Sequence, residues 1–167
     1  AVDTTSPLWK KLVLKYVEDA AKQGFDGVML DTIDSPLHWA KTKAPTRQEE
    51  MQKAAVALIQ AIRERHPHFK IMLNRGFELL PEVGHSIDFI LAESILIDSN
   101  VSTGHFDYFP ANDYNQAAEQ LHHVVALAPH LQVFTLDYWD QDDVKGLERI
   151  YDAQRAQGFV PYVTTRD

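Results

Sequence analysis

The chain has 167 residues, of which 45% are hydrophobic, with 24 acidic and 16 basic side chains and a formal net charge of −8. This length and apolar content suit a single domain over residues 1–167, and no stretch is apolar enough over a sufficient length to span a membrane. The acidic balance argues against a nucleic-acid partner, which needs clustered Lys and Arg, and the lack of cysteine excludes disulfides, thiolate metal sites and a cysteine nucleophile.

Short apolar runs alternate with longer segments of helical period, which is typical of βαβ units around a parallel sheet. A helix is predicted over residues 7–23, with Ser6 as its cap and Gly24 in the turn beyond its end. The apolar run at residues 27–30 predicts a strand that is buried on both faces.

A second helix is predicted to begin after Thr46, because Thr46 and Glu49 have the spacing of a capping box. Two strands are then predicted at residues 69–73 and 87–91, separated by a short helix over residues 77–83. The segment 98–112 has no helical period and is predicted to be a long loop. The remaining predictions are a helix over 114–128, a strand over 131–136, a helix capped by Asp140 or Asp142, and a strand over 159–163.

This pattern indicates an α/β fold, and five strands cannot close a barrel that needs eight. The chain also begins with a helix, so the strand that should precede that helix is absent. We therefore expect the C-terminal part of a (β/α)8 TIM barrel, about its last five strands, or else an open doubly wound sheet.

Four consecutive predicted strands end at polar side chains. The carboxyl ends of parallel strands carry the active sites of barrels and of open α/β sheets. The alternative interpretation is that buried strands simply end at a polar surface. The side chains concerned are Asp31, Asn74, Arg75, Glu93 and Asp137.

Asp31 and Glu93 are the candidates for a catalytic pair. Two carboxyls across a cleft suffice for glycosidic cleavage, because one protonates the leaving oxygen while the other attacks the anomeric carbon or activates water. Glu93 follows an apolar strand, and apolar surroundings disfavour a charged carboxylate, which suits a general acid. Asp34 either caps a turn in its loop, orients Asp31 or binds a sugar hydroxyl.

Further candidates offer contacts to a sugar. Asn74 and Arg75 carry several hydrogen-bond donors, and Asp137 adds an acid. Tyr138 and Trp139 provide flat faces for stacking, unless they serve only to pack helix against sheet. Three aromatic residues of the predicted loop, Phe106, Tyr108 and Phe109, either wall a cleft or hold the loop down. No HExxH spacing, Walker A motif or GxGxxG motif occurs, so neither a metal nor a cofactor is predicted.

The segments GFDGVMLDTIDS, LNRGFELL, LAESI, LDYW and GFVPYVTTRD together resemble the endo-α-1,4-polygalactosaminidase family of glycoside hydrolases, and within it the hydrolase domain of Pel exopolysaccharide proteins. The resemblance implies a TIM barrel that cleaves α-linked galactosamine or N-acetylgalactosamine polymers with retention, Asp31 being the nucleophile and Glu93 the acid/base. It also implies a secreted or periplasmic protein with further domains in the full-length chain. The resemblance also implies that four side chains line the substrate groove: Asn74, Arg75, Asp137 and Tyr138.

Two other functions stay open at this point. One is a carbohydrate-binding barrel domain without catalysis, which would bind polymer but release no oligosaccharides. The other is a metal-dependent phosphohydrolase that uses Asp31 and Asp34 on an open sheet. Against the second, the spacing of the two acids is a poor match to aspartyl-phosphate loops, and the chain has no glycine-rich phosphate cradle.

Overall fold

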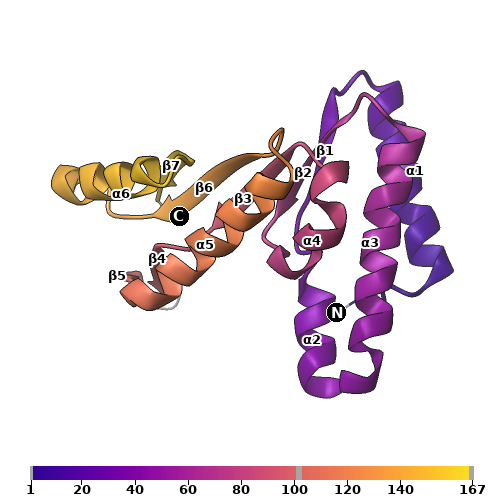
Figure 1. Cartoon of the computed structure of the whole chain (residues 1–167), viewed down its shortest axis with the longest axis horizontal. Helices are drawn as coiled ribbons and strands as arrows, with labels where there is room; N and C mark the ends of the chain where they lie inside the picture. The colour runs from indigo at the N-terminus through magenta and orange to yellow at the C-terminus, as the bar shows by residue number, and fades with distance from the viewer. Residues whose placement is uncertain (1, 101–102, 166–167) are drawn as a thin grey trace. The chain divides into compact units, whose positions relative to one another are not determined.

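The computed structural model describes residues 2–100 and 103–165. The chain divides into two compact units, Ala1–Phe89 and Ile90–Asp167, and both contain helices and strands (Figure 1). Among the residues that the structure describes, no helix combines the length and apolar character needed to cross a membrane.

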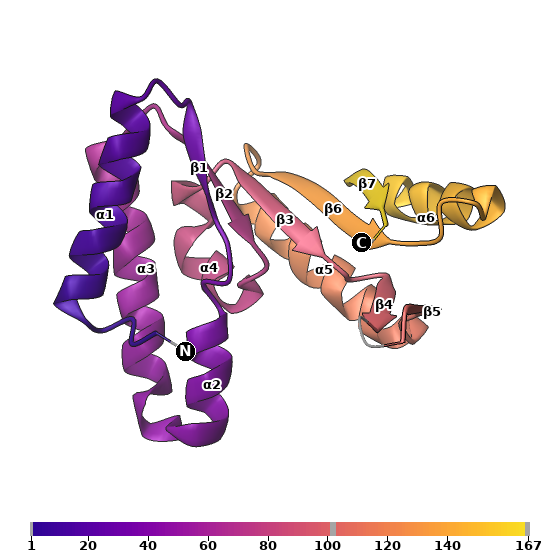
Figure 2. The ribbon, with the colours of Figure 1, turned by 180° about the vertical axis from the view of Figure 1, so that it is seen from behind.

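The first unit pairs two parallel strands with helices. Strands β1 and β2 run side by side (Figure 2), in a register that matches Gly27 to Lys70 and Leu30 to Leu73. The elements are α1 (Pro7–Lys22), β1 (Gly27–Leu30), α2 (Ser35–Lys43), the 3-10 turn η1 (Pro45–Arg47), α3 (Gln48–Arg65), β2 (Lys70–Asn74), η2 (Phe77–Leu79), α4 (Leu80–Val83) and η3 (Gly84–Ser86).

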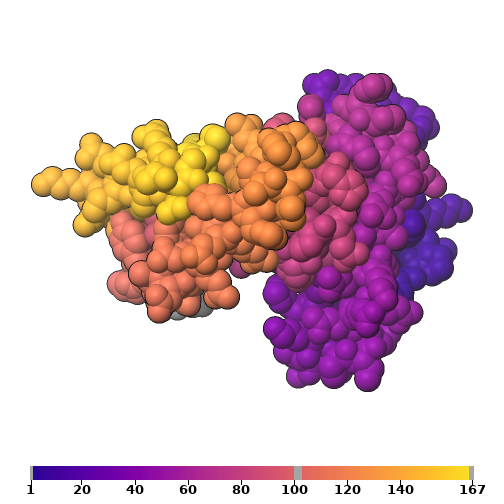
Figure 3. All heavy atoms as spheres, viewed as in Figure 1, coloured from indigo at the N-terminus to yellow at the C-terminus, as the bar shows by residue number. Residues whose placement is uncertain are grey.

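The core of this unit lies between α3 and β2. Helix α3 buries Leu58, Ile59 and Ile62, and β2 buries Ile71 and Leu73. Full burial of an aliphatic side chain of this size stabilises a fold by about 1.5–3 kcal/mol. In the space-filling view, the side chains of α3 and α4 are packed without gaps on the visible face of the unit (Figure 3).

Hydrogen bonds of Arg63 and Asp88 join the C-terminal end of α3 to the start of β2. The guanidinium of Arg63 donates to Asp88 Oδ2 at 2.6 Å and to the carbonyl oxygens of Ser86 and Phe69. Asp88 also accepts from the Ile71 N–H, at 3.0 Å. Burial alone would raise the pKa of Asp88, but its bonds from Lys70, the Ile71 N–H and Arg63 outweigh burial and hold that pKa below its ordinary value. The carboxylate is therefore charged as well as enclosed.

Several predictions for the first unit are confirmed and three are wrong. Ser6 caps α1 by accepting from the Trp9 N–H at 3.4 Å. The capping box at Thr46 is wrong, because α3 begins at Gln48 after a 3-10 turn and its N-cap, Arg47, makes no side-chain cap bond.

The other two errors concern α2 and β1. Helix α2 was not predicted, because its sequence has no apolar stripe and Pro36 suggests a break, although proline is compatible with a first helical turn. Strand β1 is not buried on both faces, since Met29 is 49% exposed.

Gly27 is required by the close approach of β1 to β2. A Cβ atom at this position would lie 2.1 Å from the carbonyl oxygen of Lys70, which is backbone and cannot rotate away. We expect Gly27→Ala to lower the free energy of unfolding by about 1–3 kcal/mol, measured by chemical denaturation. Gly24→Asn is the control: Gly24 has a φ of 86° with open space around it, and Asn tolerates that conformation. Equal stability of Gly27→Ala and the parental protein would contradict this account.

The second unit combines a parallel pair of strands with a separate hairpin. Strands β6 and β7 are parallel and match Phe134 to Val160 and Tyr138 to Thr164, whereas β4 and β5 are antiparallel. The elements are β3 (Phe89–Glu93), which starts at the boundary, β4 (Ile97–Asn100), β5 (His105–Tyr108), α5 (Ala111–Leu127), β6 (Gln132–Tyr138), α6 (Val144–Ala156) and β7 (Val160–Thr164).

Two predictions in this unit are corrected. The segment 98–112 is not a long loop, because most of it forms the β4–β5 hairpin and the start of α5. These strands have four residues each, and the alternation of polar and aromatic residues in His105–Tyr108 is too short to indicate a strand by itself. Helix α6 is capped by neither Asp140 nor Asp142 but by Asp143, whose Oδ1 accepts from the Gly146 N–H at 3.0 Å.

The α/β class with parallel strands is confirmed. The five strands expected from the apolar runs are β1, β2, β3, β6 and β7, and their predicted ends differ from the observed ones by no more than two residues. Closure into a TIM barrel, the assignment of these strands as its last five, and the organisation of residues 1–167 as one domain stay predictions.

Candidate active site

Three of the predicted site residues stand at strand ends that share a backbone feature. Asp31 directly follows β1, Asn74 is the last residue of β2, and Glu93 is the last residue of β3. Among the described residues, only three non-glycine residues have a positive φ, and each comes directly after one of these side chains: Thr32 (55°), Arg75 (55°) and Ser94 (51°). This conformation is uncommon, above all for a β-branched residue such as Thr, and strained positions of this kind cluster at functional sites.

Asp31 is exposed and is held through only one of its two oxygens. Oδ1 accepts from the Thr32 N–H at 2.8 Å and from the Asn74 side-chain amide at 2.9 Å. Oδ2 accepts no hydrogen bond from any residue in 2–100 or 103–165. The carboxylate is thus fixed in orientation while its second oxygen stays open.

Asn74 and Arg75 occupy different environments. Asn74 is buried, at 6% exposure, and its side-chain amide donates to the Asp31 carboxylate. Arg75 is exposed, and its guanidinium lies 5.7 Å from the centre of the Phe77 ring. Asn74 therefore acts on the neighbouring carboxylate, whereas Arg75 presents its charge at the surface.

Glu93 is half-buried and is held from β6. Its Oε1 accepts from the Tyr138 hydroxyl at 2.7 Å. The Ser94 N–H donates to the carbonyl oxygen of Leu136 at 2.8 Å, which ties the residue after Glu93 to the same strand. As with Asp31, a carboxylate at the end of one strand is held by a side chain from the end of another.

Asp34 is buried at 8% exposure, at the start of α2. Its Oδ2 lies 3.4 Å from the His38 Nε2, one helical turn along. No hydrogen bond joins it to Asp31. A carboxylate in this position supports α2 and is poorly placed for a sugar hydroxyl, so we do not carry Asp34 into the proposed site.

Asp137 is completely buried, with 0% exposure. Its Oδ1 accepts from the backbone N–H groups of Leu96 (3.3 Å) and Ile97 (3.1 Å), and its Oδ2 accepts from the Gln154 amide at 2.6 Å. The Tyr114 hydroxyl donates in turn to Gln154 Oε1 at 3.1 Å. Burial raises the pKa of Asp137, although its three hydrogen-bond donors act in the opposite direction. The pKa of Tyr114 is raised to about 12, mainly by burial and to a smaller extent by the nearby Asp137. Asp137 therefore supports the fold of its own unit, and its predicted contact with substrate stays a prediction.

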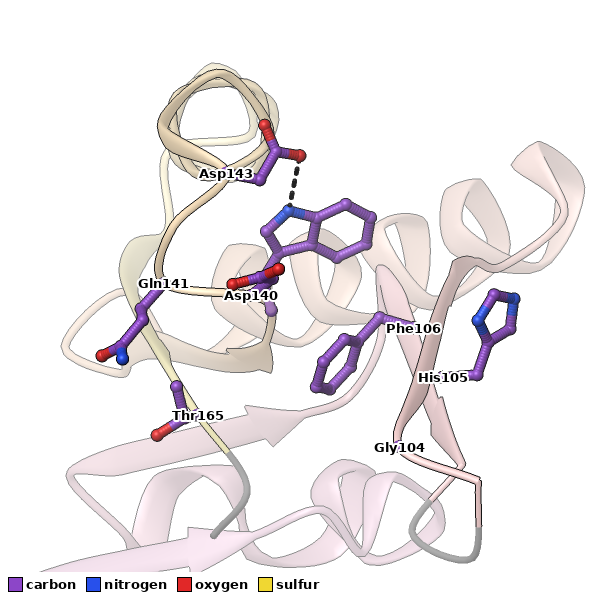
Figure 4. A pocket seen from close by; sticks show the side chains of 8 residues that line it. Gly104, His105, Phe106, Asp140, Gln141, Asp143 and Thr165 are labelled. Atoms are coloured by element: carbon purple, nitrogen blue, oxygen red, sulfur yellow. Dashed lines mark hydrogen bonds between the residues drawn. The ribbon is translucent and has the colours of Figure 1, made fainter.

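Trp139 follows β6 beside an open hollow of about 530 Å³. Its indole N–H donates to Asp143 Oδ2 at 3.0 Å, which is the dashed line in Figure 4. The indole lies 6.0 Å from the ring of Phe106 and 5.5 Å from that of Tyr108, measured between centroids. The hollow is lined by Gly104, His105, Phe106, Trp139, Asp140, Gln141, Asp143 and Thr165.

The sequence did not single out Asp140 and Gln141 as site residues, although both follow a strand end closely. Within the described part of the chain, no group of three or more His, Asp or Glu side chains could hold a metal ion.

Comparison with known proteins gives a consistent family. A model of glycoside-hydrolase family GH114 matches residues 1–167. Uncharacterized proteins of Thermotoga maritima and Methanocaldococcus jannaschii are 25% and 24% identical over 95% and 100% of this chain, which spans about half (50%) of the length of each.

Solved structures agree with this result. The glycoside hydrolase domain of PelA from Pseudomonas aeruginosa is 27% identical and superimposes with a TM-score of 0.84, covering 99% of this chain and 63% of that one. A variant of the same domain gives the same TM-score at 26% identity. The resemblance predicted from the five sequence segments is thereby confirmed.

Proposed function

The chain belongs to glycoside-hydrolase family GH114, and from this premise we propose that it carries both catalytic carboxylates of a glycoside hydrolase, Asp31 and Glu93. The observation that supports this most directly is the repeated strand end. Asp31 and Glu93 each precede a residue with positive φ, and each is held by a donor from another strand. Backbone strain maintained directly after two acids of a hydrolase family is best explained by the use of these acids in catalysis.

We assign the nucleophile to Asp31 and the acid/base to Glu93. In the first step Glu93 gives its proton to the glycosidic oxygen while Asp31 Oδ2 attacks the anomeric carbon, so the glycosidic bond breaks and a glycosyl ester forms. In the second step Glu93 takes a proton from water, whose oxygen attacks the same carbon and releases Asp31. The open Oδ2 and the doubly held Oδ1 of Asp31 support its assignment as the nucleophile.

The other side chains have supporting roles in this proposal. Asn74 and Tyr138 are positioning residues, because each donates to one of the two carboxylates. Arg75 and Trp139 are proposed substrate contacts, since each directly follows a strand end of its own unit and is at least partly exposed. No metal or organic cofactor enters either step.

The proposed substrate is an α-linked galactosamine or N-acetylgalactosamine exopolysaccharide, cut at internal positions. The net charge of −8 supports a partly deacetylated, cationic polymer, because an acidic protein attracts such a chain. The similarity to the PelA hydrolase domain supports a secreted or periplasmic setting and further domains in the full-length protein.

The test is to incubate the full-length protein with partly deacetylated galactosamine polymer and follow the products by mass spectrometry and NMR. We expect oligosaccharides of several sizes whose new reducing ends appear first as the α-anomer, unaffected by a chelator. An initial β-anomer would reassign Asp31 as a general base. Polymer binding without cleavage would leave only a carbohydrate-binding domain, and activity lost to a chelator would contradict the two-carboxylate mechanism.

A further inference from the structure

The hollow beside Trp139 lies entirely within the unit Ile90–Asp167 and is not required by the two catalytic steps. Its walls are the β4–β5 hairpin, the segment between β6 and α6, and Thr165 after β7. A volume of about 530 Å³ falls within the range of roughly 300–1,000 Å³ common for small-ligand sites. We refer to this feature as the Trp139 hollow.

The indole of Trp139 is held in place before any ligand arrives. Asp143 accepts from its N–H at 3.0 Å. On the α6 side, Gly146 gives it room, because a Cβ atom there would lie 2.1 Å from Trp139 Nε1 and 2.3 Å from Asp143 Oδ2. Phe106 and Tyr108 support the indole from the hairpin. An aromatic surface fixed in this way can receive the apolar face of a sugar ring without losing side-chain freedom on binding.

The polar part of the hollow is acidic. Asp140 is exposed, and within the described part of the chain its Oδ1 accepts only from the Asp142 N–H of the same turn, at 2.9 Å. The pKa of Asp143 is lowered by its bonds from the Gly146 N–H and the Trp139 indole, so this carboxylate is charged at neutral pH. Among the described residues that line the hollow, none is a lysine or an arginine. Carboxylates next to an aromatic face form an environment for an organic cation.

Figure 4 shows how these side chains are arranged. Asp140, Gln141 and Thr165 lie on one side of the view and Phe106 on the other, and the side chains of His105 and Phe106, which both line the hollow, extend from opposite sides of β5. Because side chains alternate along a strand, Asp107 lies on the same face of β5 as His105. Its Oδ2 lies 3.1 Å from the His105 Nε2. Asp107 does not line the hollow, so the hairpin offers this acid as a control.

We propose that the Trp139 hollow is a subsite for a sugar residue that carries a free, protonated amino group, and that it discriminates against the N-acetylated form of that residue. The indole receives the ring and the Asp140 carboxylate receives the ammonium group. An acetamide is neutral and bulkier, so it forgoes the charge-assisted hydrogen bond. The inference rests on the proposed function only in taking the ligand to be a unit of a polysaccharide.

The test measures binding by calorimetry in the full-length protein carrying Glu93→Gln, which prevents turnover. The two probes are a galactosamine tetrasaccharide and its fully N-acetylated counterpart. We expect the amino form to bind about tenfold more tightly, a difference that Asp140→Asn removes while it changes the affinity for the N-acetylated form less than about twofold. Trp139→Ala is expected to weaken both ligands about tenfold or more, and Trp139→Phe to recover part of that loss.

Asp107→Asn makes the same chemical change at a carboxylate of β5 that does not line the hollow, and it is expected to leave both affinities unchanged. The proposal is overturned if Asp140→Asn and Asp107→Asn have equal effects, or if Asp140→Asn weakens both ligands alike. Hydrolysis of the polymer, measured on Asp140→Asn with Glu93 intact, separates the two hypotheses. If Asp140→Asn cleaves the polymer normally and still binds the amino form more tightly than the N-acetylated form, the subsite is refuted and the proposed function is not. If the parental protein binds the amino form selectively but never cleaves polymer, the proposed function is refuted and the subsite is not.

Discussion

Glu93→Gln is expected to lower kcat for polymer cleavage by about a thousandfold, the usual contribution of a general acid/base. The amide keeps the size of the side chain and can still accept from the Tyr138 hydroxyl, but it has no proton to give to the leaving oxygen. Asp31→Asn is expected to cause a loss at least as large, because an amide oxygen does not form the glycosyl ester. Release of reducing ends per unit time is the measurement.

The control for this pair is Asp34→Asn, which makes the same chemical change three residues after Asp31. Asp34 is buried against His38, so we expect cleavage to remain within a few-fold of the parental rate. Thermal unfolding of all three variants verifies that the fold is intact. Parental rates in both Glu93→Gln and Asp31→Asn would refute the catalytic assignment.

Azide identifies which carboxylate is the nucleophile. With Asp31→Ala and an activated aryl oligosaccharide, azide attacks in place of the missing carboxylate, and the product is a glycosyl azide of inverted configuration. With Glu93→Ala and the same substrate, azide attacks the glycosyl ester on Asp31, and the product has the configuration of the substrate. The opposite pair of outcomes would exchange the two roles.

Asp137→Ala is expected to lower the free energy of unfolding by about 3–5 kcal/mol, because each buried polar group left without its partner costs about 1–3 kcal/mol. The change leaves the Leu96 and Ile97 N–H groups and the Gln154 amide without their acceptor in an enclosed space. Asp137→Asn is expected to cost far less. Its Oδ1 still accepts from both backbone groups, and a flipped Gln154 amide accepts from the new NH₂ while donating to the Tyr114 hydroxyl.

The same pair of proteins gives a pH dependence with a defined sign. Burial raises the pKa of Asp137 above its ordinary value of 3.8, so between that value and the raised pKa the folded state binds more protons than the unfolded chain. Stability of the parental protein therefore falls relative to Asp137→Asn as the pH rises through this window. Urea denaturation at a series of pH values from about 4 upward measures the difference.

Asp88→Asn serves as the comparison, because the pKa of Asp88 is shifted in the other direction. Its contribution to stability is present above its ordinary value of 3.8 and is lost as the pH falls through the lowered pKa. A stability difference between Asp137→Asn and the parental protein that did not vary with pH would contradict the account of Asp137.

Local patterns in the sequence were sufficient for the elements that bury a regular apolar stripe or run. The helix that ends before Gly24, the apolar part of α3 and the strands at residues 27–30 and 70–74 could all be recognised in this way. The same reasoning nominated Asp31 and Glu93, because a polar side chain directly after an apolar strand is visible in a single sequence. The family could be recognised for a similar reason, since its motifs are these strand ends.

What the tertiary structure decided is the use of each polar side chain. Asp137 and Asp31 both follow apolar runs, yet Asp137 is enclosed by groups 17 to 41 residues away in the chain, whereas Asp31 is exposed. The β4–β5 hairpin likewise depends on backbone pairing, which its polar side chains do not signal. Burial and hydrogen bonding are properties of neighbours in space, and for a polar residue these neighbours come from distant parts of the chain. A sequence alone can therefore nominate such residues, but only the packed structure separates a carboxylate that faces solvent from one that holds the fold together.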